Sequence, residues 1–306
     1  MALRIRHLLE YALVRALLAV VLSLGYERSV RLAHAIADLF YRVGKKHRKR
    51  ALANIERALP EFDAVRRAEV ARGSFRNMVR TFMETAWIPR LVVPGKMPKV
   101  CRLAGDPEAW RLFLENRGAV LVSGHFANWE LTAQMLALAG VRLSSVARAL
   151  DNPRLDRYVT GVRERYGMRI ITKEGGVRGT ARVLREGGTI AMLADQSTGR
   201  RGILVDFLGR PASTTPVPAT MALRFGVPIL LGRGVWTGNG NEYVLEADEP
   251  IMLSATGDRE ADVRAITEEI NRRLERWVRE YPEQWLWAHR RWKMRRDWFR
   301  EATDES

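Results

Sequence analysis

Short apolar runs alternate with amphipathic stretches over the C-terminal two thirds of the chain. The apolar runs have the length of strands and are bounded by turn-forming residues. They lie at residues 118–124, 141–149, 168–172, 189–195, 202–207 and 227–236. Apolar residues three and four apart predict helices between them, at residues 130–140, 153–167 and 177–187. The alternation predicts an α/β fold, with a mixed central sheet flanked by helices.

The region before this alternation has a different pattern. Residues 28–93 show helical spacing of apolar positions, for example at Leu52, Ile55 and Leu59. The sequence VVPGKMPK at 92–99 breaks that spacing and marks the start of the α/β part. A further long helix is expected at about residues 258–280.

The first fifty residues combine an apolar helix with a basic cluster. Residues 11–26 (YALVRALLAVVLSLGY) are too short and interrupted for a span, which needs about 20 apolar residues. No small-residue cleavage site follows them, so they do not resemble a cleaved signal peptide. The cluster KKHRKR at 45–50 then suits anionic lipid. Together they predict an N-terminal membrane-associating helical segment, although a core helix with a solvated basic face has the same pattern.

Composition narrows the classes of partner. There are 51 Lys and Arg residues against 35 Asp and Glu, a net charge of +16 that favours polyanions. No helix-turn-helix cue, zinc-ligand spacing or aromatic RNA-binding pattern accompanies this charge, so no nucleic-acid partner is expected. The single cysteine, Cys101, cannot form an internal disulfide and is expected to be an inert thiol.

The segment VLVSGHFANWELTA at 120–133 carries the strongest chemical signal. His125 follows an apolar strand, and a helix is expected to begin near Asn128, so His125 lies in a strand-to-helix turn. Glu130, in the first helical turn, can fold back toward the imidazole. A carboxylate on Nδ1 fixes the tautomer while Nε2 accepts a proton.

Other chemistries lack their motifs. A zinc site of the H-E-x-x-H kind needs a second histidine four residues on, and a serine nucleophile favours G-x-S-x-G. Neither pattern occurs in the chain. Spacing alone still leaves His125 open to a purely structural role.

The motif GHFANWE resembles the histidine–acid motif of the glycerolipid acyltransferase superfamily. More specifically, the chain resembles the bacterial lipid A late acyltransferase (lauroyl/myristoyl transferase) family, which is related to mycobacterial mannoside acyltransferases. The resemblance covers nearly the whole chain. Further matching segments are VARALDNP, GGVRGTARVLREGGTIAMLADQS, GILVDFLGRPASTT, ALRFGVPI and INRRLERWVREYPEQWLWAHRRWK.

This resemblance implies direct transfer of a fatty acyl chain from a thioester to a hydroxyl of a membrane glycolipid, most specifically in lipid A biosynthesis. The donor would be acyl carrier protein or coenzyme A, with no other cofactor and no metal. His125 would be the general base and Glu130 its orienting partner. Residues 46–306 would form the acyltransferase domain, with an α/β core at about 100–300. Residues 1–45 would anchor it at the cytoplasmic face of the inner membrane.

Further residues are expected to bind substrate. Arg148 suits an acceptor phosphate or the oxyanion, although a surface arginine would have the same sequence signal. Asp195 and Gln196 end another predicted strand and should lie on the same sheet edge as His125. Asn128 and Arg178, within the matching segments, complete the expected set.

Two alternatives stay open at this point. The tail QWLWAHRRWKMRRDWF at 284–299 suits either a membrane interface or buried packing of its tryptophans. The function could instead be that of a lysophospholipid or other glycolipid acyltransferase, or of a non-catalytic membrane-binding protein on the same fold.

Overall fold

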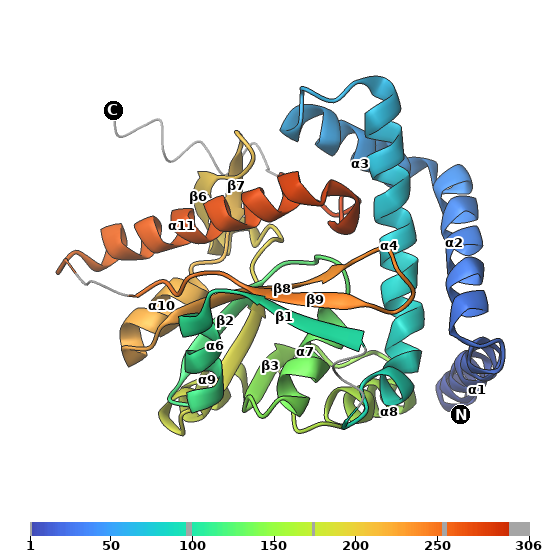
Figure 1. Ribbon diagram of the computed structural model, residues 1–306, viewed down its shortest axis with the longest axis horizontal. Coiled ribbons are helices and arrows are strands. Elements are labelled where there is room, and N and C mark those ends of the chain that lie inside the picture. The colour runs from blue at the N-terminus through green and yellow to red at the C-terminus, as the bar shows by residue number, and fades with distance from the viewer. Residues whose placement is uncertain (1, 96–99, 173–174, 253–255, 294–306) are drawn as a thin grey trace.

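The computed structural model describes residues 2–95, 100–172, 175–252 and 256–293, and has a mixed seven-stranded sheet at its centre (Figure 1). This confirms the predicted α/β class. The strands are β1 (Cys101–Gly105), β2 (Ala119–Ser123), β3 (Leu143–Ala147), β4 (Arg169–Thr172), β5 (Thr189–Leu193), β6 (Ile203–Asp206), β7 (Pro211–Thr214), β8 (Ile229–Trp236) and β9 (Tyr243–Ala247).

The sheet has the strand order β1-β9-β8-β2-β5-β3-β4. Strands β8, β2, β5, β3 and β4 are mutually parallel, and β9 pairs antiparallel with β8. The carboxyl ends of β2 and β5 are therefore neighbours at one edge. The expected strand at 202–207 forms, but β6 pairs with β7 in a separate two-stranded ribbon.

Helices precede the sheet and alternate with its strands. They are α1 (Ala2–Ser23), α2 (Tyr26–Val43), α3 (Lys45–Ala58), α4 (Ala64–Leu91), α6 (Pro107–Glu115), α7 (Trp129–Leu138), α8 (Pro153–Arg163), α9 (Gly176–Arg185), α10 (Val217–Phe225) and α11 (Arg259–Glu280), with short 3₁₀ turns η2 (Gly199–Arg201) and η3 (Pro282–Gln284).

Several helices begin where the sequence provides a side-chain cap. The side-chain oxygen of each capping residue accepts a backbone N–H of the first turn, which would otherwise have no partner. The capping residues are Asp63, Asp106, Asn128, Asn152 and Asp258. The cap at Asn128 fixes where α7 starts relative to β2, and so fixes the turn that contains His125.

The two faces of the sheet carry different features. Successive residues of a strand point to opposite faces. On β3, Ser145 lines a large cavity together with residues of α7, whereas Ser144 lines a separate cavity beside α9. Helices α7 and α9 therefore cover opposite faces.

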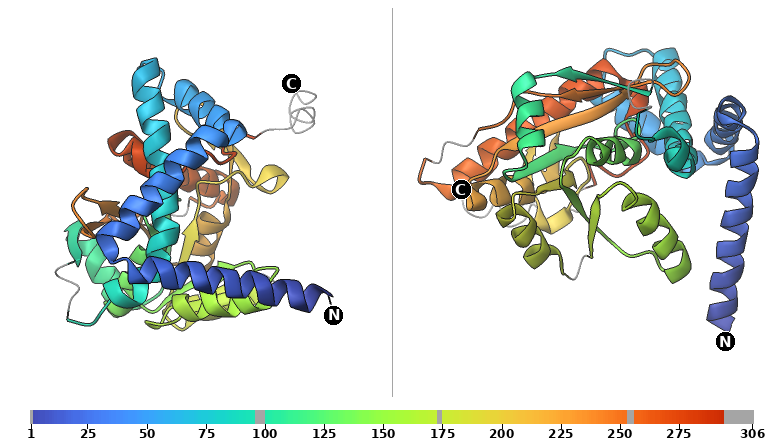
Figure 2. Two further views of the ribbon diagram at one scale, coloured as in Figure 1. Left: turned by 90° about the vertical axis from the view of Figure 1, so that its right-hand side faces the viewer. Right: turned by 60° about the horizontal axis from the view of Figure 1, so that its bottom comes forward.

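The N-terminal helix α1 lies along the side of the molecule, where it contacts α2, α4 and α8 (Figure 2). Much of its apolar surface has no cover. The exposed large apolar side chains of α1 are Leu3, Ile5, Leu8, Leu9, Leu13, Leu17 and Val20. Among the described residues, no helix combines the length and the apolar character needed to cross a membrane.

The C-terminal aromatic segment is buried. Trp285 and Trp287 are almost inaccessible, and Trp292 is 9% exposed. The rings of Trp285 and Trp287 meet edge to face at 4.7 Å between centroids. Packing therefore explains these three tryptophans, and the membrane-interface interpretation does not hold for them. Trp298 lies outside the described residues.

Candidate active site

His125 and Asp195 meet at the carboxyl ends of two adjacent parallel strands. His125 follows β2, and Asp195 follows β5. Nδ1 of His125 lies 2.7 Å from Oδ1 of Asp195. The prediction that the two residues share one sheet edge is confirmed.

The Asp195 carboxylate is fully buried and held by several donors. Its Oδ2 accepts the backbone N–H of His125 at 2.6 Å and the indole N–H of Trp285 at 2.9 Å. A Cβ at position 124 would lie 3.0 Å from Oδ2, so Gly124 leaves room for this approach. Burial raises the pKa of Asp195, but the charge and hydrogen bonds of His125 outweigh burial and hold that pKa well below its ordinary range.

The hydrogen bond at Nδ1 of His125 determines the protonation of the second ring nitrogen, Nε2. Because Asp195 accepts the Nδ1 proton, Nε2 is left as the acceptor, and the Gln196 amide nitrogen lies 3.1 Å from it. Burial alone would lower the pKa of His125. The charge and hydrogen bond of Asp195 more than compensate, so the pKa of His125 is raised above its ordinary value.

Side chains of helix α4 form hydrogen bonds with the backbone of the turn after His125. Asn77 and Thr81, one helical turn apart, both donate to the carbonyl oxygen of Ala127, at 3.2 and 2.8 Å. The N–H of Ala127 donates to the carbonyl of Gln284 at 2.7 Å. These bonds hold Ala127 at φ 43°, a left-handed conformation that a non-glycine residue rarely adopts.

Glu84, on the same face of α4, contacts the residue that caps helix α7. Its carboxylate is fully buried and accepts the Asn128 side-chain amide at 2.7 Å. The hydroxyls of Tyr26 and Tyr243 donate to the same carboxylate at 2.5 and 2.6 Å. The helix cap, the N-terminal helices and the sheet are thereby joined through one buried acid.

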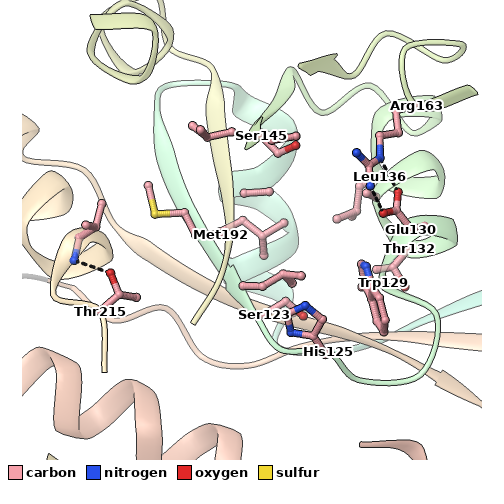
Figure 3. Close-up of a pocket in the computed structure, with 18 of the residues that line it drawn as sticks. Ser123, His125, Trp129, Glu130, Thr132, Leu136, Ser145, Arg163, Met192 and Thr215 are labelled. Atoms are coloured by element: carbon pink, nitrogen blue, oxygen red, sulfur yellow. Dashed lines mark hydrogen bonds and ion pairs between the residues drawn. The ribbon is translucent and has the colours of Figure 1, made fainter. Parts of the chain in front are cut away.

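A cavity of about 620 Å³ opens beside His125 (Figure 3). This volume is in the range of small-molecule sites, about 300–1,000 Å³. Its lining is mostly apolar or small, with polar groups near His125. The apolar lining residues are Phe82, Leu121, Trp129, Ala133, Leu136, Val146, Ala147, Ala191, Met192, Leu193 and Val217. The arrangement suits an extended hydrocarbon chain with its reactive end at the imidazole.

Glu130 does not occupy the position expected for it. It lines the cavity but is directed toward Arg163 of α8, away from the His125 ring (Figure 3). Both of its oxygens accept from that guanidinium, one at 2.9 Å. The reason is helical geometry: Trp129 packs its ring 4.9 Å from that of His125, and the next residue points about 100° around the helix. Asp195 takes the Nδ1 position instead.

The other expected substrate-binding residues lie in different environments. Asn128 is fully buried as the α7 cap, which leaves it unavailable to substrate. Arg148 has a 78% exposed side chain 3.3 Å from Asp151 and does not line the cavity. Arg178 lines the separate cavity on the α9 face. Of the expected set, Gln196 and Asp195 alone contact His125.

Sequence reasoning missed three residues that build the site. Trp285 holds Asp195, Arg163 pairs with Glu130, and His289 places its ring 6.3 Å from that of His125. Burial lowers the pKa of His289 to about 4, so it is neutral at physiological pH. All three are far from the motif in sequence, and only the segment around Trp285 carried a signal, as an aromatic-rich tail.

In the part of the chain that the structure describes, neither a group of metal ligands nor a reactive cysteine is present. There, no group of three or more His, Cys, Asp or Glu residues could hold a metal ion. Cys101 is buried in β1, and burial raises the pKa of its thiol to about 11. A thiolate is the reactive form, so Cys101 is poorly suited to act as a nucleophile.

Comparison with known proteins identifies the family. The family model for bacterial lipid A biosynthesis acyltransferases matches residues 2–294. A lipid A biosynthesis palmitoleoyltransferase of Escherichia coli (strain K12) is 25% identical over 271 residues, 82% of this chain and 80% of that protein. A phosphatidylinositol mannoside acyltransferase of Mycolicibacterium smegmatis is 25% identical over 228 residues, 73% of this chain and 72% of that protein. The chain therefore belongs to the bacterial lipid A biosynthesis acyltransferase family and is an acyltransferase.

Proposed function

We propose that the protein moves a fatty acyl chain from a thioester of acyl carrier protein or coenzyme A to a hydroxyl of a membrane glycolipid, in lipid A biosynthesis. The observation that carries this proposal is the His125–Asp195 pair at an apolar cavity. The acyl chain would lie in the cavity, with its thioester carbonyl beside Nε2.

In the proposed reaction, Nε2 of His125 removes the proton from the acceptor hydroxyl as its oxygen attacks the thioester carbonyl. Asp195 stabilises the imidazolium that forms. The tetrahedral intermediate then collapses, the C–S bond breaks, and His125 returns the proton to the leaving thiolate. The products are an ester and a free thiol, and no acyl-enzyme forms.

The oxyanion needs donors already in place. The Gln196 amide lies 3.1 Å from Nε2, close to where the carbonyl would sit. The N–H groups of Trp129 and Glu130, at the start of α7, enter no hydrogen bond with another described residue. A helix N-terminus favours negative charge, so these groups are the proposed oxyanion donors.

Replacement of His125 by Ala tests the catalytic role. Loss of a general base typically costs about 10²–10⁴-fold in rate, and the fold should remain because the ring is at the cavity surface. We expect near-complete loss of acyl transfer from acyl-CoA and from acylated acyl carrier protein. The transfer is measured by mass spectrometry of the lipid products. His47→Ala, an exposed histidine on α3, is the matched control. Near-native turnover in His125→Ala would refute the assignment and leave a non-catalytic binding protein as the alternative.

The same lipid analysis would identify the acceptor. The mannoside acyltransferase relative favours a second candidate, transfer to another glycolipid. Products in a deletion strain, with and without the restored gene, would distinguish this from lipid A modification. A lysophospholipid product would show a third acceptor class.

We further propose that α1 lies on the cytoplasmic face of the inner membrane through its exposed apolar side. Deleting residues 2–25 should move the protein toward the soluble fraction, and high salt should strip the truncated form further. Residues 45–50 would then bind lipid by charge alone, which salt screens within about 8 Å at physiological ionic strength. Membrane binding by the truncated protein in high salt would place the anchor elsewhere.

A further inference from the structure

A second, smaller cavity of about 250 Å³ lies between α3 and the C-terminal segment. Its lining is Arg50, Asn54, Arg290, Trp292 and Lys293. Arg50 ends the basic cluster that the sequence shows at 45–50, so part of that cluster faces a built cavity.

The walls of this cavity are fixed by hydrogen bonds across the two segments. Arg50 donates to the carbonyl of Ala288 at 3.0 Å. The Asn54 amide donates to the carbonyls of Trp287 and His289, at 2.9 and 3.1 Å. Arg50 is therefore held in place before a ligand arrives, which lowers the entropic cost of binding.

The positive charge around the cavity forms no ion pair with an acid among the described residues. Arg210 stacks on the Trp292 ring at 5.1 Å, and one of its guanidinium nitrogens is buried without a hydrogen-bond partner. Burial and the charge of Arg57 lower the pKa of Arg210. Within the described residues, no carboxylate forms an ion pair with the cations concerned, which are Arg50, Arg57, Arg210, Arg290 and Lys293.

Hydrogen bonds connect the C-terminal segment that lines this cavity to the catalytic turn. The hydroxyl of Ser197 donates to the carbonyl of Lys293 at 3.3 Å, and the preceding residue, Gln196, contacts His125. On the other side, Leu286 donates its N–H to the carbonyl of His125 at 3.2 Å. The main chain of Lys293 is thus one hydrogen bond away from the loop that carries Gln196.

We propose that this cavity binds a phosphate ester of a substrate, a proposal that rests on the proposed function. Guanidinium groups bind phosphate oxygens with paired, charge-assisted hydrogen bonds, and a phosphate matches several converging cations better than a single carboxylate does. The Trp292 face suits the apolar or sugar part next to the phosphate. The phosphate belongs either to the lipid acceptor or to the thioester donor.

Binding measurements in a His125→Ala background test the site without requiring turnover. The donor arm compares coenzyme A with pantetheine, which lacks the phosphates, by isothermal titration calorimetry. The acceptor arm compares flotation with phosphatidylcholine vesicles that contain phosphatidate or diacylglycerol. The variants are Arg50→Gln and Lys293→Gln. Arg102→Gln is the control, because it removes the same charge from an exposed residue on β1, outside both the cavity and the cluster at 45–50.

Each lost charge-assisted contact should weaken phosphate-dependent binding about tenfold. A loss in the donor arm identifies the donor phosphate, a loss in the acceptor arm identifies a lipid phosphate, and a loss in both means that the site accepts either. The proposal is overturned if Arg102→Gln matches the two variants in both arms, or if neither variant changes binding.

Two further outcomes keep the test decisive. If Arg50→Gln fails to fold, as judged by circular dichroism, the Lys293→Gln result decides alone, because Lys293 has an exposed side chain. Wild-type protein that binds phosphate here but transfers no acyl group would refute the proposed function and leave the phosphate site standing.

Discussion

The carboxylates of Asp195 and Glu130 lie near the same cavity, but they have different partners. Asp195 is fully buried, and its carboxylate receives hydrogen bonds from the His125 ring, a backbone N–H and the Trp285 indole. Glu130 has a 17% exposed side chain and pairs with Arg163. The sequence motif links His125 to Glu130, whereas the fold links it to Asp195. Sheet topology therefore decides which acid orients the imidazole.

The largest effect is expected from Asp195→Asn. The amide is isosteric and still accepts the bonds on Oδ2, but its NH₂ faces Nδ1 and forces the proton onto Nε2. The base is then lost, and kcat should fall by about 10³–10⁴-fold. Wild-type kcat/KM should rise with pH through the raised pKa of His125, because only the neutral ring accepts a proton. In Asp195→Asn this midpoint should move down. An unshifted pH profile with near-native kcat would contradict the pair.

A smaller loss of activity, accompanied by a loss of stability, is expected from Glu130→Gln. The ion pair with Arg163 joins α7 to α8, so its loss should lower the free energy of unfolding by about 1–3 kcal/mol. Activity should fall about tenfold or less, with little shift of the pH midpoint, because the carboxylate does not contact His125. Urea unfolding and pH–rate profiles measure both. In a double-mutant cycle, Glu130→Gln should couple to Arg163→Gln. A pH shift equal to that of Asp195→Asn would restore Glu130 as the orienting acid.

The smallest effect is expected at Arg148. Its side chain is 78% exposed and outside the cavity, so Arg148→Gln should change stability by less than about 0.5 kcal/mol. The acceptor KM and kcat should stay within about twofold of the wild-type values. Arg50→Gln provides the comparison, because it removes the same charge from the proposed phosphate cavity. A rise in acceptor KM at Arg148 alone would return the phosphate role to it.

Much of the architecture could be predicted from local pattern. The strands β2, β3, β4, β5 and β8 lie within predicted segments, because a buried parallel strand reads as a continuous apolar run. The turn at His125 and the sheet-edge position of Asp195 followed from strand ends. Strands β1 and β9 were not predicted. β1 is the edge strand of the sheet and β9 lies next to it, and a mixed pattern such as CRLAG is weakly distinguished from a loop.

The partners within the site were harder to predict because they depend on the tertiary fold. Proximity in sequence favoured Glu130, but its direction is set by the helical rotation after Trp129. Trp285 lies 90 residues from Asp195, and nothing local in either segment encodes their hydrogen bond. The buried acid Glu84 shows no motif at all, since its partners come from α2, β9 and the α7 cap.

The contacts of residues 284–286 have a consequence for biosynthesis. The carbonyl of Gln284 anchors Ala127, the indole of Trp285 anchors Asp195, and Leu286 donates to the carbonyl of His125. All three lie beyond α11, so a ribosome makes them after the catalytic turn, the sheet and the cavity walls. A nascent chain therefore contains His125 and Asp195 before it contains the residues that form these hydrogen bonds. Premature termination before this stretch would remove the hydrogen bonds that residues 284–286 make to Ala127, Asp195 and His125.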